Sequence, residues 1–119
     1  MNKILVVDDD MINRKLLNVL LKKTGKYEVI EAENGMEALN IIKNEPISMV
    51  LLDIIMPVMD GIDLLKILKT DDNYKDIPVA ILTTDDSKKT EALSLGAGNV
   101  LIKPIKEPEL MEVIESYLG

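Results

Sequence analysis

Acidic side chains follow two of the apolar runs of this sequence, at the points where buried strands would end. Asp8, Asp9 and Asp10 come directly after the first run, and Asp53 follows the third. If these runs form neighbouring parallel strands, Asp8, Asp9 and Asp53 converge on one small site at the carboxyl edge of the sheet. Like charges that close repel one another unless a cation compensates them. A set of carboxylates without His or Cys favours Mg²⁺, or Mn²⁺, over zinc.

A hydroxyl and an amine follow the last two apolar runs. Thr83 comes at the end of the fourth run and Lys103 directly after the fifth. The lysine ammonium supplies a point charge for one phosphoryl oxygen, and the threonine hydroxyl donates a hydrogen bond to another. Asp53 is the candidate nucleophile, because a carboxylate can form an aspartyl phosphate. Asp10 has a simpler expected role, as the N-cap of the helix that follows it.

Composition restricts the classes of function. The chain has 119 residues, which fits one domain spanning 1–119, and it contains neither Cys nor His. Disulfides, Cys-rich zinc sites, Ser-His-Asp triads and phosphohistidine are therefore excluded. A net charge of −7 and the lack of Phe and Trp argue against nucleic-acid binding. Because no apolar run is long enough for a membrane span or a signal peptide, we expect a cytoplasmic protein that does not bind membranes.

Five short apolar runs alternate with segments of helical spacing. The runs lie at residues 4–7, 27–30, 49–52, 79–82 and 100–102. They are nearly continuous, as strands are when helices cover both faces of a parallel sheet. In the first intervening segment, the apolar positions Ile12, Leu16, Val19 and Leu20 fall at i, i+4, i+7 and i+8. The other helices are expected around residues 34–42, 62–68, 86–95 and 108–118.

The order of these elements is strand then helix, five times over. Each crossover is long enough for a helix, and such crossovers are right-handed in nearly all proteins. The pattern therefore predicts an α/β fold, a doubly wound (βα)5 sandwich in which helices cover both faces of one parallel sheet.

Several short motifs carry a resemblance to a known family. They read LVVDD at 5–9, AENG at 32–35, LDIIMPVMDG at 52–61, IPV at 77–79, LT at 82–83, GA at 96–97 and KP at 103–104. With these motifs the chain resembles the receiver domain of two-component response regulators, of which the single-domain chemotaxis regulators are the simplest. The resemblance covers essentially the whole chain, and the 52–61 segment is its most specific part. It implies a flavodoxin-like sheet of strand order 2-1-3-4-5.

The resemblance also implies roles for the residues at the phosphoryl group. Asp53 would be the phosphoacceptor, and a histidine kinase, a histidine phosphotransfer protein or a small phosphodonor would supply the phosphoryl group. Thr83 would contact the phosphoryl group and reposition on activation. Lys103 would pair with it, and the Lys103–Pro104 peptide bond is often cis in the family.

A second set of roles concerns the metal. By resemblance, Asp9 is a direct Mg²⁺ ligand, Asp8 acts through water, and Asp53 and the backbone carbonyl of Ile55 complete the protein ligands. The expected outcome of phosphorylation is a change in the face formed by the helix at 86–95, the strand at 100–102 and the C-terminal helix. That face would bind an effector protein or output domain, and the chain would be a monomer or a weak dimer through it.

The sequence departs from the family pattern at the switch positions. Val100 stands three residues before Lys103, where the family commonly has an aromatic ring that swaps between buried and exposed positions. We therefore expect activation to act through the loop after Thr83 and the helix at 86–95. Thr84 replaces a residue that is commonly small, while Ile55 and Asp85 occupy positions that tune the lifetime of the phosphorylated state in relatives.

Three other functions fit parts of the pattern. A Mg²⁺-dependent phosphohydrolase of the haloacid-dehalogenase type would need a general acid two residues after its Asp nucleophile, where this chain has Ile55. A flavodoxin-like cofactor binder would need a phosphate loop after the first strand, where Asp8, Asp9 and Asp10 would repel phosphate. A receiver-like interaction module that is never phosphorylated would not need the full set of site residues.

Overall fold

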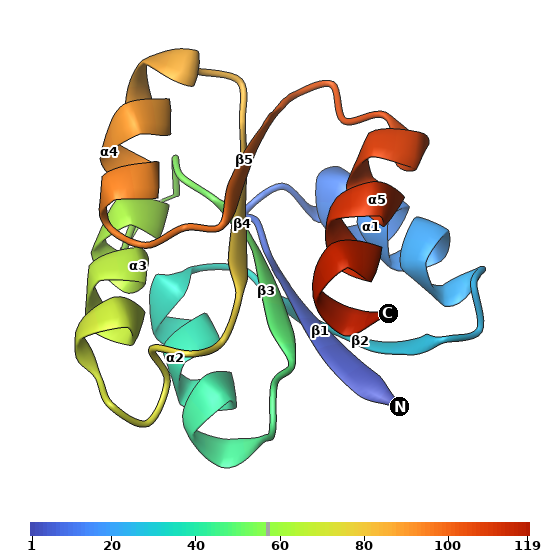
Figure 1. Ribbon diagram of the computed structural model, residues 1–119, viewed down its shortest axis with the longest axis horizontal. Coiled ribbons are helices and arrows are strands. Elements are labelled where there is room, and N and C mark those ends of the chain that lie inside the picture. Colours follow the sequence, from blue (N-terminus) through green and yellow to red (C-terminus); the bar gives the residue numbers. More distant parts are fainter. Residues whose placement is uncertain (57) are drawn as a thin grey trace.

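The computed structural model describes residues 1–56 and 58–119 (Figure 1). The strands are β1 (Asn2–Val7), β2 (Tyr27–Ala32), β3 (Met49–Asp53), β4 (Val79–Thr83) and β5 (Asn99–Ile102). The helices are α1 (Met11–Lys22), α2 (Gly35–Asn44), α3 (Gly61–Thr70), α4 (Lys89–Ser94) and α5 (Glu107–Leu118), with a 3-10 turn η1 (Asp86–Lys88) before α4. Within the described ranges no helix is both long and apolar enough to cross a membrane.

All strand pairs are parallel, and the sheet order is β2-β1-β3-β4-β5. Figure 1 shows α1 and α5 on one face of the sheet and α2, α3 and α4 on the other. This arrangement confirms the predicted doubly wound fold and its strand order. The reversal of strand order lies between β1 and β3, so ligands are expected at the carboxyl ends of these two strands.

The strands supply most of the core because both of their faces are covered. Alternate residues of β1 point to opposite layers: Leu5 and Val7 pack with α2, α3 and α4, whereas Ile4 and Val6 pack with α1 and α5. All four are at most 1% exposed. The sheet is thereby held rigid up to its last residues, which are the ones that carry the predicted site.

Side chains at the helix starts satisfy backbone donors that the helices leave free. Asp10 accepts a hydrogen bond from the Ile12 backbone N–H, which confirms its expected role as an N-cap. Asn34 caps α2 through the Glu37 N–H, and Asp60 caps α3. The start of each helix after β1, β2 and β3 is therefore fixed close to the carboxyl edge of the sheet.

The apolar stripe that predicted α1 is not the face that this helix buries. Ile12, Leu16 and Val19 are 60–68% exposed. The buried residues of α1 are Leu17, Leu21 and Arg14. The helix has two apolar stripes, and the packing of Leu17 and Leu21 against β1 and α5 decides which one enters the core. The outer stripe remains on the surface beside the predicted site.

Candidate functional site

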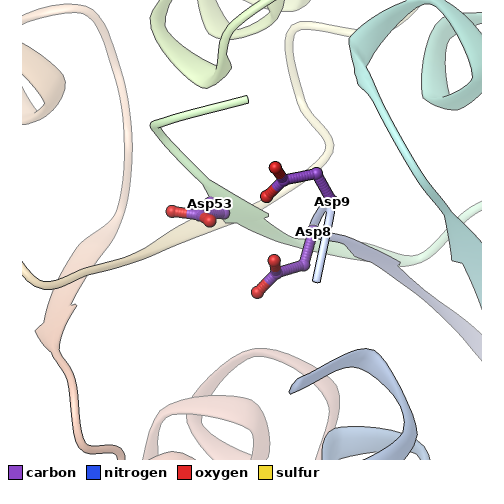
Figure 2. A group of neighbouring side chains, drawn as sticks. All are labelled: Asp8, Asp9 and Asp53. Carbon is purple, nitrogen blue, oxygen red and sulfur yellow. The ribbon is translucent and has the colours of Figure 1, made fainter. Parts of the chain in front are cut away.

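Parallel pairing of β1 with β3 brings the acidic residues together. Val7 is paired with Leu52, so Asp8 and Asp53 are the next residues at the same edge of the sheet. Carboxylate oxygens of Asp8, Asp9 and Asp53 lie within 4.8 Å of one another. Figure 2 shows the three carboxylates reaching into the same space from the ends of β1 and β3. Asp8 is buried, Asp53 is half-buried and Asp9 is exposed, which gives the site an open side.

Glycine at two positions lets the starts of α2 and α3 lie against the backbone of the loop that carries Ile54 and Met59. The Gly61 N–H donates to the Ile54 carbonyl at 2.8 Å, and a Cβ at Gly61 would overlap the Asp53 carbonyl oxygen. At the start of α2, a Cβ on Gly35 would lie 2.7 Å from the Met59 carbonyl oxygen. Both helix starts can therefore approach the backbone of this loop only because a side chain is missing there.

Lys103 directly follows the edge strand β5 and brings a positive charge to the carboxylates of Asp8 and Asp53. Its Nζ lies 3.1 Å from Asp8 Oδ2 and 3.5 Å from Asp53 Oδ2. Its backbone N–H donates to the Thr83 carbonyl at 2.7 Å, which ties the end of β5 to the end of β4. The peptide bond between Lys103 and Pro104 is cis, as the family resemblance implies. One ammonium thus faces three carboxylates, and the site has an excess of negative charge.

The pKa of Asp53 is raised above its ordinary value of 3.8. Burial is the main cause, and the neighbouring Asp8 charge acts in the same direction. The Lys103 ammonium opposes both effects, as does a hydrogen bond from the Ile55 backbone N–H. The ionised Asp53 side chain is therefore poorly compensated by the protein alone, which favours binding of a cation at the site.

Thr83 and Ile55 lie at the edge of this cluster. Thr83 is buried at the end of β4, and its Oγ1 accepts a hydrogen bond from the Asp85 N–H at 3.1 Å. Ile55 follows Asp53 by two residues and has an exposed side chain. The fold therefore brings Asp8, Asp9, Asp53 and Lys103 into direct proximity and places Thr83 on the adjacent strand.

Two residues next to the site, Arg14 and Glu31, were not predicted from the sequence to have a role there. The Arg14 Nη1 donates to the Asp8 carbonyl at 2.7 Å, and its Nε donates to Glu31 Oε1 at 3.2 Å. Burial raises the pKa of Glu31, but hydrogen bonds from Lys15, Asn18 and Arg14 and the Lys15 charge bring it below its ordinary value of 4.5. The spacing of Arg14, Leu17 and Leu21 places Arg14 on one of the two stripes of α1, but only the structure shows that this stripe is the buried one.

The donor set fits a hard divalent cation. It consists of carboxylate oxygens on one open-sided site, with neither nitrogen nor sulfur ligands, as Mg²⁺ prefers. The same site holds an ammonium and a nucleophile-capable carboxylate within 3.5 Å of each other. These groups together suit the transfer of a phosphoryl group, which depends on positioning and neutralisation of charge.

The family model of the response regulator receiver domain matches residues 4–115. The chain belongs to this family. Receiver domains are signalling domains that work with histidine kinases and downstream effectors, and they typically bind Mg²⁺.

Three relatives are similar to this receiver domain over nearly its whole length. A chemotaxis protein CheY homolog of Campylobacter jejuni is 36% identical over 120 residues, which is 98% of this chain and 92% of that protein. The crystal structure of chemotaxis response regulator CheY4 of Vibrio cholerae superposes with a TM-score of 0.90 at 33% identity and covers 99% of both chains. The response regulator TrrA of Thermotoga maritima, solved in complex with Mg²⁺-BeF, has a TM-score of 0.90 at 32% identity, covering 99% of this chain and 100% of that one.

Proposed function

We propose that residues 1–119 act as one cytoplasmic phosphoacceptor switch in a two-component phosphorelay, with Asp53 as the residue that is phosphorylated. The observation that carries this proposal is the contact of Lys103 Nζ with both Asp8 and Asp53, at 3.1 and 3.5 Å, beside a cluster of three carboxylates. A nucleophile, a fixed cation and a set of metal ligands are then present within one small site.

The chemistry is a transfer from a phosphohistidine of a histidine kinase or phosphotransfer protein. A carboxylate oxygen of Asp53 attacks phosphorus and forms the new O–P bond. The P–N bond to the donor imidazole breaks, and the imidazole leaves with the electron pair and takes up a proton. Lys103 pairs with a phosphoryl oxygen, and the Thr83 hydroxyl donates a hydrogen bond to another once its side chain turns toward Asp53.

The metal ligands of this proposal are the carboxylates of Asp8, Asp9 and Asp53 and the backbone carbonyl of Ile55. Asp9 would bind directly and Asp8 through water. Mg²⁺, or Mn²⁺, supplies charge neutralisation for the phosphoryl oxygens when it is bound. Water can enter on the exposed side near Asp9, so we also propose that the chain hydrolyses its own acyl phosphate and performs no other catalysis.

The output of the switch is assigned to the face of α4, β5 and α5, which would bind an effector protein or output domain. Movement of Thr83 would break the hydrogen bond that its Oγ1 accepts from the Asp85 N–H. Asp85 directly precedes η1, which leads into α4. Val100 is half-buried in the core beneath α4 and has no ring to swap. The signal is therefore proposed to pass through residues 84–94. The free chain is proposed to be a monomer or a weak dimer through this face.

The outer stripe of α1 is proposed as the docking surface for the protein donor. Ile12, Leu16 and Val19 are exposed there, and the groove beside them reaches Asp8 and Lys103. Residues 11–27 contain five basic residues and no acidic one, in a chain whose net charge is −7. A donor face that combines apolar side chains with surrounding acidic residues would complement this surface.

Intact mass spectrometry tests the proposal. The chain is incubated with acetyl phosphate and Mg²⁺, and one added phosphoryl group is expected. The Asp53→Asn variant and a wild-type sample with Mg²⁺ chelated are expected to remain unmodified. A phosphoryl group that persists in Asp53→Asn would refute Asp53 as the acceptor.

A further inference from the structure

Arg14 is a buried cation beside the acidic site, and the phosphoryl chemistry above does not use it. It lies one turn into α1 and is 8% exposed. Its Nη1 donates to the Asp8 carbonyl at 2.7 Å and its Nε to Glu31 Oε1 at 3.2 Å. Burial of a guanidinium is costly unless its donors find partners. These two contacts therefore fix both the place and the orientation of the group.

The carbonyl that Arg14 binds belongs to the peptide unit between Asp8 and Asp9. A peptide unit is planar, so a hydrogen bond to its oxygen also fixes the orientation of the Asp9 amide. The Asp8 carboxylate is held separately, by Lys103 Nζ at 3.1 Å and the Asp10 N–H at 2.9 Å. Within residues 1–56 and 58–119, no hydrogen bond to another residue holds the exposed Asp9 carboxylate. Its direction depends on the backbone that Arg14 holds.

Glu31 at the end of β2 holds Arg14 in turn. Its Oε2 accepts hydrogen bonds from Lys15 Nζ at 2.9 Å and Asn18 Nδ2 at 2.7 Å, while Oε1 accepts from Arg14. The carboxylate is thus fixed by three residues on consecutive turns of α1. The network connects α1, the end of β2 and the last peptide of β1.

We propose that Arg14 is a positioning residue for the divalent cation. Through the Asp8–Asp9 peptide it holds the Asp9 carboxylate in the arrangement that the ion requires, and Glu31 holds Arg14. This inference rests on the proposed function, because it needs the acidic site to bind Mg²⁺. Groups behind metal ligands commonly control affinity in this way.

If Arg14 acted only through its positive charge, its effect on Mg²⁺ affinity would be the opposite of the effect expected from positioning. A positive charge near the site repels Mg²⁺, so removing it without any loss of positioning would strengthen binding. Arg14→Met removes both the charge and the hydrogen bonds, whereas Arg14→Lys keeps the charge and loses the forked geometry. Comparing these two variants separates positioning from simple repulsion.

The test is the Mg²⁺ dissociation constant measured by titration calorimetry at constant ionic strength. Roughly tenfold weaker binding is expected in both Arg14→Lys and Arg14→Met, and a smaller weakening in Glu31→Gln. Lys22→Met is the matched control, because Lys22 is an exposed cation in the last turn of the same helix and lies outside the Arg14–Glu31 network; its affinity should stay within about twofold of wild type. Phosphorylation by acetyl phosphate should need more Mg²⁺ in the Arg14 variants but reach the wild-type rate at saturation.

Three results would overturn the inference. Unchanged or tighter Mg²⁺ binding in folded Arg14→Met would assign Arg14 a repulsive role or none. If the Arg14 variants do not fold, wild-type affinity in Glu31→Gln would reject the network as a positioning device. A wild-type chain that binds no Mg²⁺ would refute the proposed metal site together with this inference, whereas either of the first two results would refute this inference alone.

Discussion

Lys103 is the residue on which the charge balance of the site depends. It contacts Asp8 and Asp53 at once, while Asp9 contributes a third carboxylate close by. The raised pKa of Asp53 is the measurable consequence, because burial and the Asp8 charge outweigh the Lys103 ammonium. In the metal-free protein the ionised Asp53 side chain therefore opposes folding.

Asp53→Asn is expected to stabilise the Mg²⁺-free protein at neutral pH, because it removes a buried charge that the protein compensates poorly. A pKa that is higher in the folded than in the unfolded state favours folding at low pH, and that contribution is lost as the pH rises through the folded value. The advantage of Asp53→Asn should therefore be absent below the ordinary value of 3.8 and full above the folded pKa. Denaturant unfolding of both proteins in EDTA across this pH range measures it. An advantage that does not change with pH would contradict the electrostatic explanation.

The residue types at the strand ends were sufficient to predict which side chains meet. Asp8, Asp9, Asp53 and Lys103 were each predicted from their place after an apolar run, and the structure brings them together. The place of Arg14 beside the site was not predicted. It depends on the rotation of α1 about its axis, and no short sequence motif specifies that rotation. The structure shows that the four predicted side chains lie together, and the roles assigned to them, to Thr83 and to the Ile55 carbonyl are proposals.

At the scale of elements, α1 shows where hydrophobic periodicity is ambiguous. Both of its stripes have helical spacing, but only Leu17 and Leu21 fit between β1 and α5. The position of the helix was predicted correctly, and its rotation was set by tertiary packing and by the bonds of Arg14 to Asp8 and Glu31. Exposed apolar side chains were thereby left beside the groove that reaches Asp8 and Lys103.

Leu16→Asp is expected to reduce phosphotransfer from a protein donor at least tenfold, because it places a charge in the exposed apolar stripe. Phosphorylation by acetyl phosphate should not change, since the exposed Leu16 side chain takes no part in the proposed chemistry. The donor is a phosphorylated histidine phosphotransfer domain that is first shown to phosphorylate the wild-type chain. Met36→Asp on α2 is the matched control, as an exposed apolar residue of a helix on the other face of the sheet. Equal losses in the two variants, or none in Leu16→Asp, would reject α1 as the docking surface.

At the scale of the whole molecule, the order of the parallel strands determines which side chains meet at the carboxyl edge of the sheet. Parallel β1 and β3 end side by side, and β4 and β5 bring Thr83 and Lys103 to the same edge. The alternation of strands and helices predicted this architecture because each element is unambiguous in type, even where its rotation is not. The five basic residues in segment 11–27, on a chain of net charge −7, could be counted from the sequence alone. Their proposed role in docking the donor depends on the position of α1 beside the site.

Mg²⁺ is expected to stabilise the entire fold. A ligand that binds only the folded state adds about 1.4 kcal/mol to the free energy of unfolding at ten times its dissociation constant. The melting temperature should therefore rise with Mg²⁺ in the wild type and much less in Asp9→Asn, at an ionic strength matched with KCl. Equal shifts in both proteins would indicate nonspecific screening of the negative charge.

The most direct test of the central claim is to locate the phosphoryl group itself. The chain is phosphorylated with acetyl phosphate and Mg²⁺, the acyl phosphate is reduced with borohydride to homoserine, and the peptides are sequenced by mass spectrometry. The result expected here is homoserine at position 53 and at no other aspartate. Homoserine at position 8, 9 or 10, or none after verified phosphorylation, would contradict the assignment of Asp53 as the phosphoacceptor.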